Sequence, residues 1–267
     1  MSIPQALPSR PDIEMSGKIV IVTGGASGTG AGIVQGFLDA GAKVAICDRP
    51  EMAEKANGQA RFFPCDLRSH GSITGAVDGI ASEFRRIDVL VTAAGGSPNV
   101  DFATVSPRFH EGVLALNLHG PIHFAQAVHR HMIANDEGGA IVNLTSIAAL
   151  RPAPQTSCYA AARAGILGLT KSLAMEWAPH IRVNAIVAGM VDWGDDALPY
   201  GSADARRAIC EALPGKRMGA PADVAMAALY LASPMASYIS GTTMELHGGG
   251  EPPLFLDIIK RHSAIRA

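Results

Sequence analysis

The sequence has few cysteines and no long apolar run. Its 267 residues include four cysteines, and no two of them form a Cys-x-x-Cys pair. This usage is typical of a reduced intracellular protein and unlike that of a disulfide-rich secreted domain. No run is long and apolar enough to span a bilayer, and residues 1–16, which carry three prolines, lack the apolar core of a signal peptide. We therefore expect a cytoplasmic protein with no membrane partner.

Charged and aromatic residues are also scarce, at 17% and 5% of the chain, and the formal net charge is −2. Because no basic stripe is present, nucleic acid is not expected as a partner. The hydrophobic fraction of 48% is ample for a sizeable core and argues against disorder. One stretch is rich in histidine, but its spacing is irregular and no cysteine joins it. No metal site is therefore predicted from these side chains: His110, His119, His123, His129 and His131.

Apolar runs alternate with segments of helical periodicity along most of the chain. The runs predict strands at 18–22, 43–47, 60–65, 89–92, 140–144, 182–187 and 243–246, and the periodic segments predict helices at 30–40, 69–84, 109–134, 157–177 and 221–232. Most strand runs are unbroken, which is typical of a parallel sheet buried on both faces. The pattern predicts an α/β fold with a doubly wound parallel sheet of about seven strands and helices on both faces.

No internal linker divides the chain, so we expect one domain over residues 17–250. Residues 1–16 are expected to form a loose tail, and residues 251–267 a C-terminal extension with a short apolar patch. Residues 189–215 mix glycine and proline with other residues and are expected to form a flap over the substrate.

The stretch Thr23-Gly24-Gly25-Ala26-Ser27-Gly28-Thr29-Gly30 joins the first predicted strand to the first predicted helix. Glycine in this position lets the backbone approach a pyrophosphate closely, because no side chain intervenes. The following helix directs its free N–H groups and positive dipole end at the same phosphate. The loop therefore predicts a dinucleotide site with these cofactor-binding residues: Gly24, Ser27, Gly28, Thr29 and Gly30.

Acidic residues follow the second and third predicted strands. Asp48 lies 18 positions beyond Gly30, close to where a dinucleotide-binding fold places a carboxylate for the ribose 2′-hydroxyl. A carboxylate there repels a 2′-phosphate, so Asp48 favours NAD over NADP, whereas Arg49 could hold that phosphate. The other interpretation of Asp48 is a turn former before Pro50. Asp66 and Leu67, at the third strand end, are expected to contact adenine.

Small or polar residues end several other predicted strands, among them Ala94, Gly95, Ser146 and Gly189. Ligands of open parallel sheets bind at the carboxyl ends of the strands. We therefore expect Thr23, Asp48, Asp66, Ala94, Ser146 and Gly189 to line one crevice.

Ser146, Tyr159 and Arg163 are the candidates for proton transfer. Tyr159 and Arg163 are four residues apart and so share one face of a helix. A fixed cation stabilises a phenolate, and a serine hydroxyl can hold a substrate oxygen as charge develops. The alternative is a half-buried aromatic beside a surface charge. Asn117, unfavourable in mid-helix, is either held by a specific hydrogen bond or simply solvated.

Together these residues resemble the short-chain dehydrogenase/reductase family over about residues 16–249. The family's Thr-Gly-x-x-x-Gly-x-Gly motif matches Thr23 to Gly30 in full, and its adenine-binding acid, active-site Asn, Ser and Tyr match Asp66, Asn117, Ser146 and Tyr159. The resemblance implies a single Rossmann-like domain that oxidises a small-molecule alcohol or reduces a ketone with NAD(P). It also implies a homotetramer or homodimer, and cofactor contacts from Tyr159, Arg163, Gly189 and Val191.

The sequence departs from the family where Tyr-x-x-x-Lys reads Tyr159-Ala-Ala-Ala-Arg163, and where Trp193 and His247 replace the usual Thr and Asp. An arginine keeps the charge but does not readily release a proton. Halohydrin dehalogenases, which resemble this family, carry Ser-Tyr-Arg and no nicotinamide, and an aromatic residue blocks the place of their second motif glycine. That position is Gly28 here, which favours an oxidoreductase. A nucleotide-binding pseudoenzyme is the third alternative.

Overall fold

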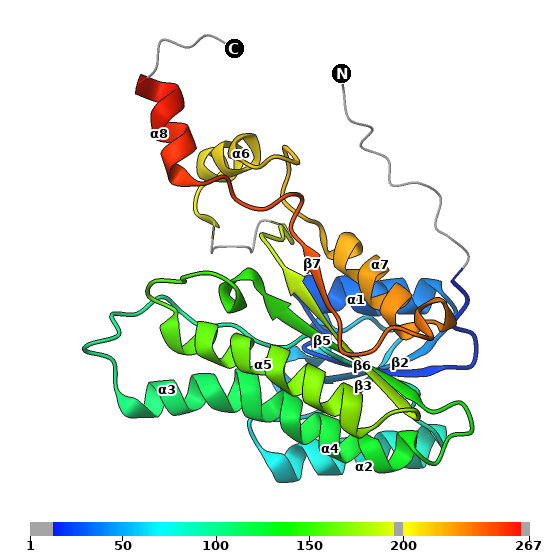
Figure 1. Ribbon diagram of the computed structural model, residues 1–267. Helices are drawn as coiled ribbons and strands as arrows, with labels where there is room; N and C mark the ends of the chain where they lie inside the picture. The colour runs from blue at the N-terminus through cyan, green and yellow to red at the C-terminus, as the bar shows by residue number, and fades with distance from the viewer. Residues whose placement is uncertain (1–12, 195–199, 263–267) are drawn as a thin grey trace.

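The computed structural model describes residues 13–194 and 200–262. Its centre is a parallel sheet of seven strands in the order β3-β2-β1-β4-β5-β6-β7 (Figure 1). The expected fold class is therefore confirmed. Much of the predicted tail 1–16, the middle of the segment 189–215 and the end of the extension 251–267 lie outside the described residues. The strands are β1 Ile19–Thr23, β2 Lys43–Asp48, β3 Arg61–Pro64, β4 Val89–Thr92, β5 Gly139–Ser146, β6 Ile181–Ala188 and β7 Thr243–Leu246.

Helices cover both faces of this sheet. In Figure 1, α1 and α7 lie together on one face and α2, α4 and α5 on the other. The α-helices are α1 Gly28–Asp39, α2 His70–Phe84, α3 Pro107–Leu114, α4 Gly120–Met132, α5 Ser157–Glu176, α6 Ala203–Ala212, α7 Pro221–Ala232 and α8 Leu254–His262. Short 3-10 turns lie at Pro50–Lys55, Ile147–Ala149 and Pro234–Ala236, and a π-helical turn at Ala115–His119.

The apolar run of β1 shows why both faces are covered. Side chains alternate between the two faces of a strand. Val20 and Val22 join the core formed with α1 and α7, whereas Ile19 and Ile21 join the core formed with α2 and α4. All four are at most 3% exposed, so a polar residue at any of them would lie in one core or the other.

The strand order reverses direction between β1 and β4, whose carboxyl ends lie side by side. At this point the backbones approach closely, because a Cβ on Gly24 would lie 2.8 Å from the Cα of Ala94. The Thr23 hydroxyl also accepts a hydrogen bond from the Ala94 N–H at 3.1 Å. Such a reversal leaves a crevice above the strand ends.

Two segments differ from the prediction. The helix expected over 109–134 is interrupted by the π-helical turn Ala115–His119, because Pro121 has no N–H to donate to the carbonyl of residue 117. The segment 189–215, expected to be irregular, contains helix α6. Its N-terminus is capped by Ser202, whose hydroxyl accepts a hydrogen bond from the Ala205 N–H at 3.2 Å. The flanking glycine and proline concealed this helix in the sequence.

Candidate active site

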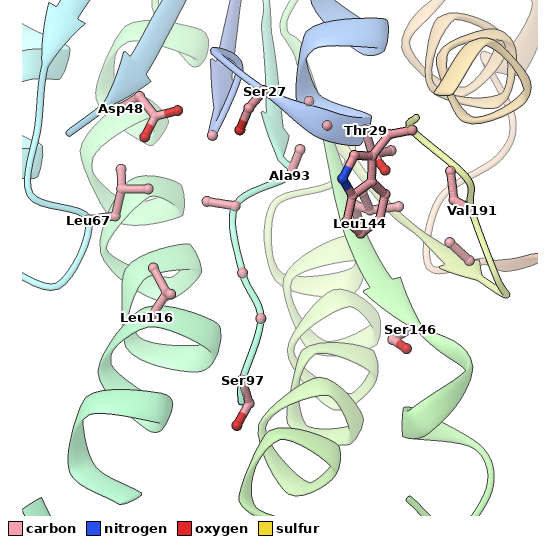
Figure 2. A pocket seen from close by; sticks show the side chains of 18 of the residues that line it. Ser27, Thr29, Asp48, Leu67, Ala93, Ser97, Leu116, Leu144, Ser146 and Val191 are labelled. Atoms are coloured by element: carbon pink, nitrogen blue, oxygen red, sulfur yellow. The ribbon is translucent and has the colours of Figure 1, made fainter. Parts of the chain in front are cut away.

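A cavity of about 1160 Å³ opens above the carboxyl ends of the central strands. Figure 2 shows Asp48, Leu67 and Leu116 on one side of it and Ser146 and Val191 on the other. Most of the residues predicted for the site line this cavity: Gly24, Ser27, Gly28, Thr29, Gly30, Asp48, Arg49, Asp66, Leu67, Ala94, Gly95, Ser146, Tyr159, Arg163, Gly189 and Val191. The exceptions are Asn117 and Thr23, which was expected at the crevice but is buried beneath it, 3% exposed.

The glycine loop is closely packed against itself. Gly24 and Gly28 have φ of +67° and +54°, a region that residues with a Cβ rarely adopt. A Cβ on Gly30 would lie 2.1 Å from the carbonyl oxygen of Gly24, so only glycine fits there. Helix α1 begins at Gly28, and the N–H groups of its first turn have no partner within the helix. The loop thus offers N–H donors and a dipole end to an anion.

Asp48 lies at the end of β2, 6% exposed. One carboxylate oxygen accepts a hydrogen bond from the Ala26 N–H at 3.3 Å, and the other accepts one from the Arg49 N–H at 2.9 Å. The side chain therefore ties β2 to the glycine loop and does more than form a turn. The Arg49 guanidinium pairs with Glu51 at 3.2 Å.

Asp66 and Leu67 follow β3 at the same end of the cavity. The Asp66 N–H donates to the Ser72 hydroxyl at 2.9 Å, and its carboxylate accepts a hydrogen bond from the Arg68 N–H at 3.0 Å. Leu67 is 6% exposed. These contacts place an exposed carboxylate and an apolar side chain at the same end of the cavity as Asp48.

Ser146 and Tyr159 line the opposite end. The Ser146 hydroxyl, at the end of β5, accepts a hydrogen bond from the Ala148 N–H at 3.2 Å. The Arg163 guanidinium carbon lies 5.1 Å from the centroid of the Tyr159 ring, one turn away on α5. Arg163 is only 4% exposed, so its interpretation as a surface charge is wrong.

The Arg163 guanidinium is held by two strand ends. It donates to the Leu144 carbonyl at 3.0 Å and to the Ala94 carbonyl at 3.2 Å. A Cβ on Gly95 would lie 1.6 Å from one of its terminal nitrogens, so the guanidinium occupies space that only glycine leaves open. Its Nε is buried and has no partner among the described residues. One donor of the buried cation thus remains available.

Asn117 is fully buried, so its interpretation as a solvated position is wrong. Its side-chain oxygen accepts a hydrogen bond from the Gly96 N–H at 2.9 Å, and its nitrogen donates to the carbonyls of Gly96 and Val113, each at 2.9 Å. These bonds fix the segment after β4 that forms the cavity wall. Asn117 therefore does not line the cavity itself but holds Gly96, which does.

The comparisons with known proteins agree with this geometry. Residues 24–251 match the family model described as enoyl-(acyl carrier protein) reductase. The D-threitol dehydrogenase of Mycolicibacterium smegmatis is 36% identical over 249 residues, covering 89% of this chain and 94% of that protein. The chain belongs to the short-chain dehydrogenase/reductase family.

Solved structures of short-chain dehydrogenases share the fold. A putative short-chain alcohol dehydrogenase from Sinorhizobium meliloti has a TM-score of 0.82 at 32% identity, with 90% of this chain and 98% of that chain covered. A gluconate 5-dehydrogenase from Burkholderia cenocepacia, solved in complex with NADP and tartrate, has a TM-score of 0.81 at 28% identity and covers 89% and 96%. The relatives are named dehydrogenases and reductases, which supports an oxidoreductase here.

The described residues of this short-chain dehydrogenase/reductase include no helix that is long and apolar enough to cross a membrane. Among the same residues, no three His, Cys, Asp or Glu side chains gather closely enough to hold a metal ion. The His123 ring lies beside the rings of His70 and His119, and burial lowers the pKa of His123.

Sequence reasoning did not assign Trp193 and Tyr200 to the cofactor site of this family member. A Cβ on Gly28 would lie 3.7 Å from the indole of Trp193, so the ring covers the start of α1. The Tyr200 hydroxyl accepts a hydrogen bond from the Val191 N–H at 3.2 Å. Burial raises the pKa of that hydroxyl, and neighbouring Tyr159 raises it further. The presence of two aromatic residues in a segment otherwise rich in small and polar residues was the available signal.

Proposed function

We propose that the protein is an NAD(P)-dependent oxidoreductase that transfers a hydride between a nicotinamide cofactor and a small secondary alcohol or ketone. The observation that carries this proposal is a single cavity lined by the glycine loop, the Asp48 carboxylate and the Ser146-Tyr159 pair. Family membership supports the reaction class, since the relatives are named for dehydrogenation and reduction.

The residues present fit a dinucleotide. Gly28 and the first turn of α1 would hold the diphosphate, because the loop leaves no room for a side chain at Gly30 and offers N–H donors. The Asp48 carboxylate would accept hydrogen bonds from the ribose hydroxyls. The buried Nε of Arg163, which has no partner among the described residues, is suited to a hydroxyl of the second ribose.

The chemistry follows from the residues at the other end of the cavity. A bound nicotinamide supplies or accepts the hydride. The Tyr159 hydroxyl gives a proton to the substrate oxygen in reduction, and the Tyr159 phenolate takes that proton back in oxidation. The Ser146 hydroxyl holds the same oxygen, and the Arg163 cation stabilises negative charge on Tyr159 across the 5.1 Å ring contact. Arg163 cannot itself pass on a proton, so the final transfer to solvent goes through another path.

NAD is the proposed cofactor in preference to NADP. Asp48 places a carboxylate at the ribose end, where a 2′-phosphate would be repelled. Arg49 is the only residue that the sequence offered as a phosphate partner, and its guanidinium pairs with Glu51 at 3.2 Å.

A fluorescence titration with NADH and NADPH tests this proposal. We expect NADH to bind more tightly than NADPH. In an Asp48→Asn variant we expect NADH to bind about tenfold more weakly, because a charge-assisted hydrogen bond is lost. In the same variant we expect the difference in affinity between NADH and NADPH to shrink or reverse. Glu51→Gln, which frees Arg49, is the matched control and should improve NADPH binding alone. A wild-type preference for NADPH would overturn the NAD assignment.

Turnover tests the reaction class separately from binding. We expect NAD-dependent oxidation of at least one compound in a panel that includes threitol, gluconate and simple secondary alcohols. NADH binding without turnover across the panel would instead favour a nucleotide-binding protein that is not an enzyme.

A halohydrin-dehalogenase-like lyase is the second candidate, and one observation favours it. The Trp193 indole lies over Gly28, the position that an aromatic residue blocks in those enzymes, and the Ser-Tyr-Arg set is present. Halide released from a halohydrin without added cofactor would support this candidate. NAD-dependent oxidation by the same preparation, with no halide release, would exclude it.

We also propose that the protein forms a homotetramer or homodimer, as the family resemblance implies. A cytoplasmic location is proposed as well, because the cysteine usage is typical of a reduced intracellular protein. Light scattering of the full chain measures the assembly directly. A monomeric mass at working concentration would contradict it.

A further inference from the structure

We propose that Trp193 and Tyr200 fill the nicotinamide half of the cofactor site in the free protein, and that binding of a nicotinamide cofactor requires both side chains to leave it. The inference rests on the proposed function and names residues that determine the affinity for the cofactor. It concerns only one half of the cavity, because the adenosine half is lined by Asp48, Asp66 and Leu67.

The first observation is the position of the Trp193 indole. The nearest ring carbons lie 3.7 Å from where a Cβ on Gly28 would stand, so the indole lies directly over this glycine. Gly28 opens α1, so the indole covers the face of the helix N-terminus that would receive a phosphate. The ring is 39% exposed, which shows that it rests on the cavity wall and is not part of the core. A bound diphosphate and an indole cannot share this position.

The second observation is the Tyr200 hydroxyl. It accepts the hydrogen bond of the Val191 N–H at 3.2 Å, and Val191 is a residue that the family resemblance assigns to the cofactor. The Tyr200 ring lies 6.4 Å from the Trp193 ring, centroid to centroid, so the two aromatic side chains form one unit. Both line the same cavity as Tyr159 and Arg163. The protein thus uses its own side chains where a ligand would bind.

The backbone on either side of Trp193 is anchored independently of its indole. The Asp192 N–H donates to the Gly219 carbonyl at 2.8 Å, and the Asp192 carboxylate accepts a hydrogen bond from the Gly194 N–H at 3.1 Å. Asp192 also pairs with Arg206 of α6. The Trp193 side chain can therefore rotate while its backbone stays in place. A change of rotamer at one exposed ring is a fast motion of low cost.

The consequence is a selective loss of affinity. If the filled state dominates in the free protein, only a fraction of the molecules has an open half-site. The apparent association constant for NAD is then the intrinsic constant multiplied by that fraction. The affinity for adenosine, which carries no phosphate and reaches only the adenosine half, is not affected. Removing the indole therefore separates the two ligands.

The experiment measures the dissociation constants of NAD and adenosine by calorimetry for the wild type, Trp193→Ala and Tyr200→Phe. We expect Trp193→Ala to bind NAD about three- to tenfold more tightly and adenosine with unchanged affinity. Tyr200→Phe keeps the ring but removes the acceptor of the Val191 N–H, so it should tighten NAD binding by a smaller factor. Trp177→Phe is the matched control, because Trp177 contacts His129 and lies outside the cavity.

Fluorescence gives an independent readout. The chain has two tryptophans, so Trp177→Phe leaves Trp193 as the only emitter. We expect NAD to shift its emission to the red as the indole moves into water, and adenosine to leave the emission unchanged. Weaker NAD binding by Trp193→Ala would mean that the indole stacks on the bound cofactor, and this result would overturn the inference. Unchanged NAD binding in both variants would also overturn it and leave the proposed function intact. A wild type that binds neither ligand would overturn the proposed function itself.

Discussion

Replacing Tyr159 by phenylalanine is expected to lower turnover by about a thousandfold or more while the dissociation constant for NADH changes by less than about twofold. The substitution removes only the hydroxyl that transfers the proton, an effect that general acid–base catalysis places at about 10²- to 10⁴-fold. The ring stays in place, so the cavity wall and the contact with the Arg163 guanidinium at 5.1 Å are retained. Steady-state kinetics and a parallel NADH titration measure the two quantities separately.

Tyr238→Phe is the matched control for Tyr159→Phe. Tyr238 is fully exposed, at 102% of its reference area, so loss of its hydroxyl should change neither turnover nor binding. Near wild-type turnover in Tyr159→Phe would contradict the proposed mechanism. A parallel loss of NADH binding would point to a structural role for the hydroxyl.

The placement of the site could be predicted because it follows from topology. Unbroken apolar runs indicated a parallel sheet, and the carboxyl ends of parallel strands meet at one edge. Asp48, Ala94 and Ser146 are far apart in the sequence, yet each is the last residue of a strand or lies just beyond it. The structure places all three at one cavity. This argument needed only strand positions, and those positions were within a few residues of the observed ones.

The contacts inside the site could not be predicted, because they depend on side-chain direction across distant elements. The sequence left open whether Arg163 was buried, since the four-residue spacing from Tyr159 puts both side chains on one face of α5 but does not say whether that face packs inward. The π-helical turn around Asn117 depended on how the chain accommodates Pro121 at the start of α4. The contact of Trp193 with Gly28 joins residues 165 positions apart in the sequence (193 − 28) and required the position of the segment after β6.

Replacing Gly95 by alanine is expected to lower the free energy of unfolding by about 3 kcal/mol and to abolish NADH binding. The new Cβ would lie 1.6 Å from a terminal nitrogen of Arg163 and 2.6 Å from the side-chain oxygen of Asn117. Neither neighbour can withdraw freely, because Arg163 is bonded to two carbonyls and Asn117 to Gly96 and Val113. Overpacking of this kind typically costs about 1–3 kcal/mol, and the φ of +156° adds strain for a residue with a Cβ. Urea denaturation and NADH titration measure both effects.

Gly96→Ala separates backbone strain from the clash. Gly96 has a φ of +146°, close to that of Gly95, but a Cβ there would have no atom within 4 Å. The difference between the two alanine variants therefore reports the overlap with Arg163 and Asn117. We expect the loss of unfolding free energy to be smaller in Gly96→Ala than in Gly95→Ala by at least about 1 kcal/mol. Equal losses would mean that strain alone makes glycine necessary at position 95.

A double-mutant cycle then identifies the neighbour that matters. Arg163→Lys alone should destabilise the protein by about 1–3 kcal/mol, because one ammonium cannot bridge the carbonyls of Ala94 and Leu144 as the planar guanidinium does. In the Arg163→Lys background the terminal nitrogen at 1.6 Å is gone, so Gly95→Ala should cost less than in the wild type. A coupling of about 1 kcal/mol or more would show that Gly95 and Arg163 act as one unit. If the losses of unfolding free energy are additive, the clash of the new Cβ is with Asn117. The position of the Arg163 guanidinium beside Tyr159 would then not depend on Gly95.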